Sequence, residues 1–304
     1  MNAALSLGAT LYMPCTRDDA IERLFGHLRI AGLRSAVLCL EDSIRESDIP
    51  LALGHLSSTL RKMAARVPSA ADPKVFIRPR GPGMLERILH LPGIDRIQGF
   101  VIPKAHADSL PAYLALRLHD DHQLMPTLES REALDAHEMR RLRDQLLGVQ
   151  DRILALRIGG NDLLSAMGLR RAAGRTAYDG PLGPVIATLV ATFAPWGFAL
   201  SAPVFERFGD PAVLREEVLR DIEHGLLTKS AIHPDQILTI QSALGVSAQQ
   251  IEEARMILAS DGPAVFSNLG TMCEPATHRA WAERLVVRAE IFGIVDPLPM
   301  PLRA

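Results

Sequence analysis

The sequence has few aromatic residues and almost no net charge. Phenylalanine, tryptophan and tyrosine make up 5% of its 304 residues, which is too few for the base-stacking surface of a nucleic-acid-binding protein. The formal net charge of −2 argues equally against DNA, RNA or an anionic membrane as the partner. A small molecule therefore remains the expected partner.

Cysteine is also scarce, and long hydrophobic runs are missing. Cys15, Cys39 and Cys273 form no Cys-x-x-Cys pair, which is typical of a reducing compartment and provides no zinc-binding pattern. The first residues lack the charged and then apolar pattern of a signal peptide. The longest apolar stretch, residues 184–200, is interrupted by proline and glycine. The sequence therefore predicts a cytoplasmic protein without a membrane-spanning segment.

Short apolar runs alternate with stretches of helical periodicity along most of the chain. The runs that we expect to be strands are residues 7–13, 35–40, 74–78, 97–102, 123–128, 152–158, 198–202 and 228–232. They are continuously apolar, as strands buried on both faces of a parallel sheet require. Eight strand-then-helix units predict a TIM-type (β/α)₈ barrel. The alternative, an open nucleotide-binding sheet, would be expected to carry a Gly-x-Gly-x-x-Gly or Walker A motif, and the sequence has neither.

The chain continues beyond the eighth unit. Helical patterns predict helices at residues 248–260 and 274–292, and the glycine-, serine- and asparagine-rich residues 261–273 between them predict a loop. Within the barrel, residues 131–147 predict one charged helix with an apolar inner face. We expect residues 1–246 to form the barrel and residues 247–304 a helical C-terminal extension, which would serve as a lid or an oligomer contact.

Active sites of TIM barrels lie at the carboxyl ends of the strands, which selects a short list of charged residues. These candidates are Arg17, Glu41, Asp42, Arg78, Lys104, Glu129 and Asp162. Glu129 and Asp162 follow adjacent strands, so their carboxylates can share one hard cation. Two carboxylates with water and substrate oxygens are the usual Mg²⁺ arrangement, and Glu129 would then also lie against the substrate. The alternative is that both acids cap the helices that follow them.

Arg78 ends an apolar strand, where its guanidinium group needs an anion. A substrate carboxylate or enolate would provide one, and an internal ion pair with Glu41 or Asp42 is the alternative. Glu41 and Asp42 are candidates for the base, for orienting Arg78 and for capping the next helix. We expect Lys104 and Arg17 to bind substrate, against the alternatives of a structural lysine and a solvated arginine at a helix start.

Seven short motifs, in this order, give the sequence a resemblance to a known family. They are Leu11-Tyr12-Met13-Pro14, Leu40-Glu41-Asp42, Ile77-Arg78, Val101-Ile102-Pro103-Lys104, Pro126-Thr127-Leu128-Glu129, Gly159-Gly160-Asn161-Asp162-Leu163 and Ile232-His233-Pro234-Asp235-Gln236. From about residue 7 to about residue 260, the chain resembles the citrate lyase beta-subunit-like branch of the HpcH/HpaI aldolase superfamily. Its Met-Pro-Thr-Leu-Glu motif is most similar to carbon–carbon bond lyases of the TIM-barrel fold.

The resemblance implies that Glu129 and Asp162 bind Mg²⁺, with Mn²⁺ as the alternative ion, and that Arg78 holds a carbonyl or carboxylate of the substrate. It implies cleavage or formation of a carbon–carbon bond through an enolate. The implied substrate is a small oxo-acid or an acyl-CoA thioester, and the implied assembly is a homotrimer or homohexamer. The sequence departs from the family pattern at Cys39, where an aspartate is usual, and at Ser201, where an aspartate often follows the seventh strand.

We therefore expect a metal-dependent carbon–carbon bond lyase or aldolase. A thioester hydrolase or a malate-synthase-like condensing enzyme would use the same metal site, and the sequence does not separate these alternatives. A non-catalytic scaffold barrel would predict degraded metal ligands, whereas Glu129 and Asp162 are both present.

Overall fold

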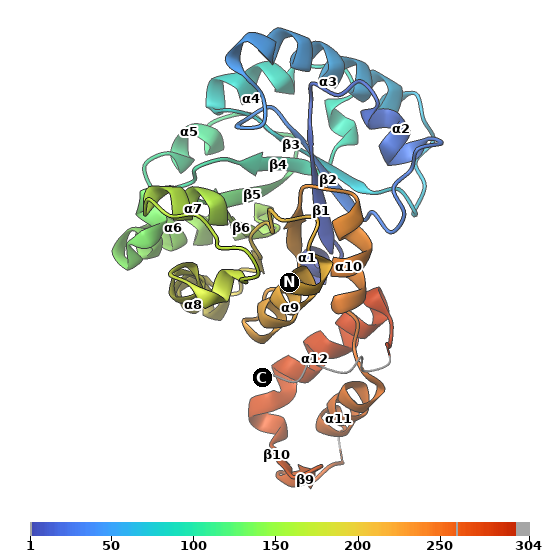
Figure 1. Cartoon of the computed structure of the whole chain (residues 1–304), viewed down its shortest axis with the longest axis vertical. Helices are drawn as coiled ribbons and strands as arrows, with labels where there is room; N and C mark the ends of the chain where they lie inside the picture. The colour runs from blue at the N-terminus through green and yellow to red at the C-terminus, as the bar shows by residue number, and fades with distance from the viewer. Residues whose placement is uncertain (1, 260, 296–304) are drawn as a thin grey trace.

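A parallel sheet of eight strands forms the centre of the computed structural model, which describes residues 2–259 and 261–295 (Figure 1). The strands are β1 Ala9–Pro14, β2 Ser35–Cys39, β3 Lys74–Arg78, β4 Gly99–Ile102, β5 Gln123–Leu128, β6 Leu156–Ile158, β7 Leu200–Ser201 and β8 Lys229–Ala231. They lie in the order β7-β6-β5-β4-β3-β2-β1-β8. An isolated parallel bridge between Ala202 and Lys229 joins β7 to β8 and closes the cylinder. The structure thus confirms the predicted (β/α)₈ barrel.

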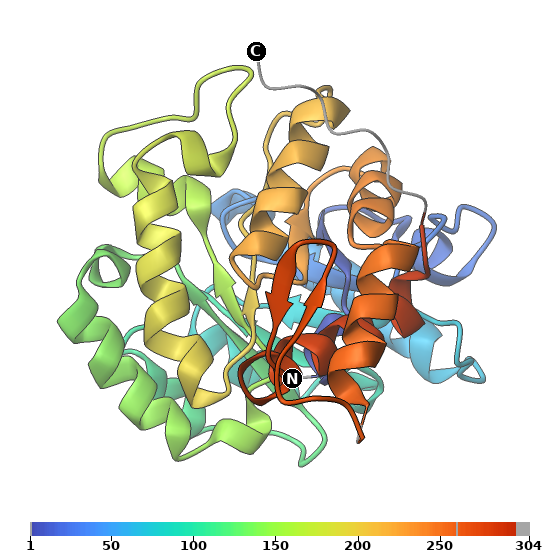
Figure 2. The same ribbon diagram turned by 90° about the horizontal axis from the view of Figure 1, so that it is seen from below.

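Helices follow the strands and cover the outside of the barrel (Figures 1 and 2). They are α2 Ala20–Phe25, α3 Ile49–Ala64, α4 Pro82–Leu89, α5 Leu110–Leu114, α6 Ala136–Leu147, α7 Gly160–Ala166, α8 Leu182–Phe193, α9 Pro211–Glu223 and α10 Asp235–Ala243. A further short helix, α1 Asn2–Leu5, precedes β1. The single helix predicted at 131–147 is wrong, because the chain leaves helical geometry at Asp135. The side chain of Asp135 accepts a hydrogen bond from the backbone N–H of His137 and so caps α6.

Two of the predicted strands are much shorter in the structure. The apolar run at 152–158 forms a strand only over Leu156–Ile158, because residues 150–152 form a 3₁₀ turn and Ile153 makes one isolated bridge to Leu124. The run at 198–202 likewise narrows to the two residues of β7. By contrast, β3 and β5 have the predicted bounds. The barrel wall is therefore least regular at β6 and β7.

The interior of the barrel is filled by side chains from alternate positions of the strands. Its apolar part consists of Ala4, Leu7, Val37, Phe76, Val101, Met125, Leu154 and Ala155. Ala4 and Leu7 precede β1, so this cluster closes the end of the barrel at which the strands begin. Residues nearer the carboxyl ends of the strands, such as Arg78 and Arg157, carry polar groups instead. The barrel is therefore a packed core with a polar end, as the fold requires.

The elements after α10 pack around an apolar cluster of their own. They are α11 Ala248–Leu258, β9 Phe266–Asn268, β10 Thr271–Cys273 and α12 Pro275–Phe292. The loop predicted at 261–273 is a β-hairpin in the structure, because Leu269 and Gly270 both adopt the positive φ that a tight two-residue turn needs.

Helix α12 contacts α1, at the end of the barrel where the strands begin (Figure 1). Within one chain, the extension therefore does not cover the carboxyl ends of the strands. Its role as lid or oligomer contact stays a prediction, and residues 260 and 296–304 of the predicted extension lie outside the described residues. No helix in the described part of the chain has the length and hydropathy needed to cross a membrane.

Candidate active site

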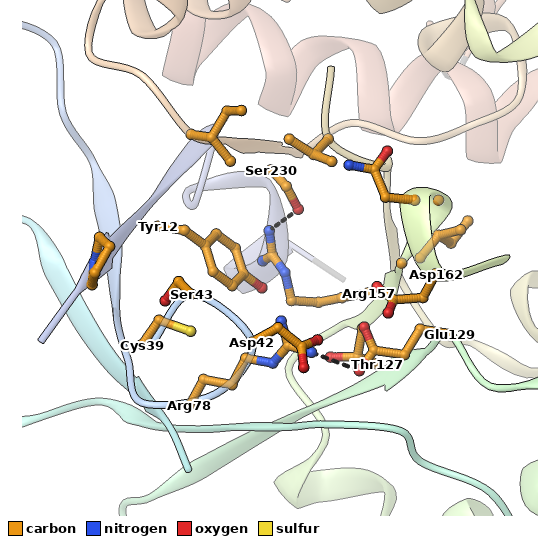
Figure 3. A pocket seen from close by; sticks show the side chains of 17 residues that line it. Tyr12, Cys39, Asp42, Ser43, Arg78, Thr127, Glu129, Arg157, Asp162 and Ser230 are labelled. Carbon is orange, nitrogen blue, oxygen red and sulfur yellow. Dashed lines mark hydrogen bonds and ion pairs between the residues drawn. The ribbon is translucent and has the colours of Figure 1, made fainter. Parts of the chain in front are cut away.

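A cavity of about 570 Å³ opens at the carboxyl ends of the strands (Figure 3). Its polar lining includes Tyr12, Asp42, Arg78, Thr127, Glu129, Arg157, Asp162 and Ser230. These residues stand in barrel strands or in the loops and helix that follow them, so the fold itself brings them together. The volume is typical of a small-molecule site.

Arg78, the last residue of β3, contacts two buried glutamates. Its Nη2 donates to Oε1 of Glu129 at 2.6 Å and lies 3.0 Å from Oε2 of Glu41. Burial alone would lower the pKa of Arg78, but the negative charges of the two glutamates raise it above its ordinary value. The predicted ion pair with Glu41 is therefore present, and the guanidinium group still lines the cavity.

Glu129 follows β5 directly and is 3% exposed. Its Oε1 accepts hydrogen bonds from Arg78 and, at 2.8 Å, from the backbone N–H of Lys104. Among the described residues, none donates to its other oxygen, Oε2. Burial raises the pKa of Glu129 to about 7, and the nearby charges of Asp162 and Glu41 also act upward. One oxygen of this carboxylate is thus fixed by the protein, and the other is available for a ligand.

Asp162 lies in the first turn of α7, half-buried and facing the same cavity (Figure 3). Burial, followed by the charge of Asp42, raises its pKa. Gly159 allows the strand ends to approach, because a Cβ at that position would meet the Cβ of Glu129 at 2.3 Å. Neither acid is an N-cap residue, although Asp162 does lie in the first turn of α7, where an acidic side chain stabilises a helix. Ser130 follows Glu129 at the cap of the next turn, and Gly159 is the N-cap of α7.

Glu129 and Asp162 fit a hard divalent cation. Both offer carboxylate oxygen, the donor that Mg²⁺ prefers. Burial raises the pKa of both carboxyl groups, and the charge of Asp162 raises that of Glu129 further; a bound cation would favour the charged form of each. The described residues contain no cluster of three or more His, Cys, Asp or Glu side chains placed to hold a metal. The remaining ligands of a cation here would therefore be water and substrate oxygens, as is usual for Mg²⁺.

Lys104 and the pair Glu41 and Asp42 form an ionic cluster beside this carboxylate pair. Nζ of Lys104 lies 2.6 Å from Oε1 of Glu41 and 3.2 Å from Oδ1 of Asp42. Oε2 of Glu41 accepts from the backbone N–H of Asp42 at 2.8 Å and also contacts Arg78. Both oxygens of Glu41 are therefore engaged in holding the two cations in position. Asp42 lines the cavity, and 55% of its side chain is exposed.

With this geometry in place, comparison with known proteins identifies the family. A sequence model described as C–C bond lyase of the TIM-barrel fold matches residues 1–294. The chain belongs to this family. Among curated proteins, none matches the sequence.

Several solved structures show the same fold at low sequence identity. CitE from Mycobacterium tuberculosis in complex with magnesium, acetoacetate and coenzyme A is 22% identical over 94% of this chain and 99% of that chain, with a TM-score of 0.68. RipC from Yersinia pestis is 22% identical over 82% of this chain and 99% of that chain, with a TM-score of 0.60.

The citrate lyase beta subunit from M. tuberculosis, complexed with oxaloacetate and magnesium, is 22% identical over 80% of this chain and 99% of that chain, with a TM-score of 0.57. The family match confirms the resemblance to carbon–carbon bond lyases of the TIM-barrel fold, and these likenesses confirm the fold.

Two of the predicted substrate-binding residues do not line the cavity. Arg17 lies in the loop after β1, with 42% of its side chain exposed, and its Nη2 is 2.6 Å from Oδ2 of Asp19. This ion pair satisfies Arg17 at the start of α2, which agrees with the solvated alternative. Lys104 is not part of the cavity lining; 51% of its side chain is exposed, and its Nζ contacts Glu41 and Asp42.

The cavity is also lined by polar residues that were not among the predicted site residues, namely Tyr12, Ser43, Thr127, Arg157, Asn161 and Ser230. Arg157 stands in the middle of β6, and the sequence analysis treated it only as part of an apolar strand. A charged side chain between Leu156 and Ile158 was the available signal, because both neighbours pack outward against the helices. By the alternation of a strand, Arg157 must then point into the barrel.

Proposed function

We propose that this protein is a Mg²⁺-dependent carbon–carbon bond lyase that cleaves or forms a bond in a small oxo-acid, free or as an acyl-CoA thioester, through an enolate. The observation that supports this reaction best is the convergence of Glu129, Asp162 and Arg78 on one cavity. Structures of similar fold have been solved with magnesium and acetoacetate or with magnesium and oxaloacetate, which agrees with such a substrate.

The roles of the residues follow from their contacts. Glu129 and Asp162 would hold the cation, which when bound supplies Lewis-acid stabilisation of negative charge on a substrate oxygen. Arg78 would hold the carboxylate or carbonyl oxygen of the substrate, because its guanidinium group lines the cavity and carries a fixed positive charge. Glu41 would keep that group oriented, since its Oε2 lies 3.0 Å from Nη2 of Arg78.

Asp42 suits the role of the base better than Glu41. Both oxygens of Glu41 already have partners, whereas Asp42 reaches the cavity. Burial would raise the pKa of Asp42, but its contacts with Glu41 and Lys104 outweigh burial and lower that pKa. Asp42 is therefore ionised at neutral pH and able to accept a proton from the substrate.

Calorimetric titration with Mg²⁺ tests the metal site. We expect the wild-type protein to bind the ion and Glu129→Gln to lose this binding while keeping its melting temperature. The control is Glu132→Gln, which also follows β5 but pairs with Arg131 outside the cavity. Equal Mg²⁺ affinity in wild type and Glu129→Gln would refute the metal site.

Turnover tests the reaction itself. Purified protein would be incubated with a panel of oxo-acids and their CoA thioesters, and the products of carbon–carbon cleavage would be followed by mass spectrometry. We expect a product that requires Mg²⁺ and that is absent with Glu129→Gln and with Asp42→Asn. Hydrolysis of a thioester without carbon–carbon cleavage would instead favour the thioester hydrolase alternative.

A further inference from the structure

Arg157 is a buried cation in the barrel interior that contacts only neutral groups. Its side chain is 1% exposed and is among the largest fully buried side chains of the described residues. Its Nη2 donates to Oγ of Ser230 at 2.7 Å, and its Nη1 lies 3.4 Å from Oγ1 of Thr10. Its Nε has no hydrogen-bond partner among the described residues. An arginine is always charged in a protein, so this arrangement leaves a full positive charge without a counterion.

Three of the other buried cations have carboxylate partners, whereas Arg288, which is 6% exposed, contacts no carboxylate among the described residues either. Arg171 contacts Glu206 and Glu217, and Lys229 contacts Glu217 and Asp221. Arg78 contacts Glu41 and Glu129 in the same way. Burying a charge is costly unless an opposite charge compensates it, and each of these three cations has two carboxylates. No salt bridge among the described residues involves Arg157. Unlike Arg288, Arg157 lines the cavity at the carboxyl ends of the strands, where an anion of the substrate could reach it.

The residues around Arg157 form a polar site that opens to the cavity. Thr127 is the register partner of Arg157 across β5 and β6, so both side chains enter the barrel at the same level. Oγ1 of Thr127 is buried and also lacks a hydrogen-bond partner among the described residues. Tyr12 lies against the guanidinium group, whose Cζ is 5.3 Å from the ring centroid. Arg157, Thr127, Tyr12 and Ser230 all line the cavity (Figure 3).

We propose that Arg157, with Thr127 and Ser230, forms a second anion-binding subsite at the floor of the cavity and that it holds a second carboxylate of the substrate. Arg78 and the carboxylate pair Glu129 and Asp162 serve the oxo-acid end. The substrate class is then a short oxo-dicarboxylate rather than a monocarboxylate. This inference rests on the proposed function for the oxo-acid end of the substrate, whereas the subsite itself rests on Arg157 and its neighbours.

The partners of Arg157 and Arg78 distinguish the two ends of the cavity. Arg78 contacts Glu41 and Glu129, whereas no salt bridge among the described residues involves Arg157. The oxygens of a substrate carboxylate would be acceptors for the free N–H of Arg157 and the hydroxyl group of Thr127.

The test compares ligands with one and two carboxylates in the full-length protein with Mg²⁺. Dissociation constants of pyruvate, oxaloacetate and succinate would be measured by calorimetry for wild type, Arg157→Met and Arg157→Lys. The matched control is Arg152→Met, an arginine just before β6 whose Nη2 contacts the carbonyl of His119 outside the cavity. Succinate has two carboxylates but no oxo group, so its binding reports the subsite without depending on the oxo-acid chemistry.

We expect Arg157→Met to weaken oxaloacetate and succinate binding by roughly 10- to 100-fold and to leave pyruvate binding nearly unchanged, the size expected for hydrogen bonds to a charged group. The affinity of Arg157→Lys for both dicarboxylates should lie between those of wild type and Arg157→Met. If the methionine variant does not fold, the lysine variant provides the test. Loss of succinate binding in Arg157→Met supports the subsite even if no oxo-acid is cleaved.

Two results would overturn the subsite. One is a wild-type protein that binds neither dicarboxylate, and the other is a pair of Arg157 variants that bind both as wild type does. Tighter binding of inorganic phosphate than of succinate, dependent on Arg157, would overturn the assignment to a carboxylate. The two claims can also be separated. If pyruvate binding requires Mg²⁺ and Glu129 but no Arg157 variant changes the binding of any ligand, the subsite is refuted and the proposed function is not.

Discussion

The backbone N–H of Lys104 donates a hydrogen bond of 2.8 Å to Oε1 of Glu129. Lys104 makes this contact from the left-handed region of the backbone, with φ of 47°, which side chains other than glycine rarely adopt. Oε1 is thereby fixed by a main-chain donor and by Arg78 together. Such strain is typical of functional sites, where the surrounding structure holds a residue in place.

This strained position gives a test that separates the backbone of Lys104 from its side chain. Lys104→Gly and Lys104→Met both remove the ion pairs with Glu41 and Asp42, but only glycine relieves the positive φ. We expect the free energy of unfolding, measured in urea, to be about 1 kcal/mol higher for Lys104→Gly than for Lys104→Met. Both variants keep the N–H donor to Glu129 and should keep Mg²⁺ affinity. Equal stability of the two would show that the position carries no strain.

Replacement of Arg78 tests its role in anion binding. Lysine keeps the positive charge of Arg78 but not the planar fork, so we expect Arg78→Lys to bind pyruvate with Mg²⁺ roughly tenfold or more weakly. The control is Arg141→Lys, which alters a surface arginine paired with Asp108 and Glu138. Calorimetry gives the dissociation constants. Unchanged affinity in Arg78→Lys would exclude a direct contact with the substrate.

The fully buried Lys229 should matter for stability and not for metal binding. Its Nζ lies 2.8 Å from carboxylate oxygens of both Glu217 and Asp221, and all three side chains are buried. Lys229→Met would leave the buried Asp221 without a cation, while Glu217 would keep only its contact with Arg171. We expect the free energy of unfolding to fall by about 3–5 kcal/mol.

Lys74→Met provides the comparison, because Lys74 contacts only the hydroxyl group of Ser6 and should lose much less stability. Mg²⁺ affinity, measured on the folded Lys229→Met protein, should remain that of wild type. A similar small loss of stability in both lysine variants would contradict a structural role for the buried network.

Asp179 links stability to pH. Burial would raise its pKa, but its contacts with Arg220 and Thr176 lower that pKa to about 2 in the folded protein. The unfolded chain keeps the ordinary, higher pKa. The stabilisation is therefore fully present above about pH 4 and is lost as the pH falls toward 2.

We expect Asp179→Asn to unfold with a free energy about 1 kcal/mol lower than wild type at pH 7, because a partly exposed ion pair contributes little more than this. In denaturant titrations, the difference between the two proteins should shrink as the pH is lowered from 5 toward 3. A difference that stays constant with pH would mean that the charge of Asp179 is not involved.

The sequence predicted the barrel because the relevant signals are local. Continuous apolar runs ended by proline or glycine mark buried parallel strands, and β3 and β5 appear with the predicted bounds. It did not predict the break at Asp135, because a cap formed by one side chain is a detail of three-dimensional geometry. The hairpin at 266–273 was missed because its strands are short and the turn depends on positive φ at Leu269.

The candidate site was predicted in part for the same reason. Strand ends can be located in the sequence, so Arg78, Glu129 and Asp162 were found and do line one cavity. The contacts that each side chain makes depend on distances in the folded protein, and the spacing of residues along the sequence does not determine these distances. Arg17 turns to Asp19 and leaves the cavity. Arg157 was missed because its importance lies in the missing counterion, which becomes visible only when its neighbours are known.

The joint between β7 and β8 has a consequence for motion. Adjacent strands such as β1 and β2 pair over five residues, whereas β7 meets β8 through the single bridge at Ala202. The side chain of Arg157 extends from β6 to β8, where it donates a hydrogen bond to Ser230. One side chain therefore connects the strands on either side of β7, where the pairing between strands is weakest. Amide protons at Ala202 and Ser230 should therefore exchange with solvent sooner than those of β2. An anion held by Arg157 would slow that exchange, so a ligand would tighten the cylinder at the point where it opens most easily.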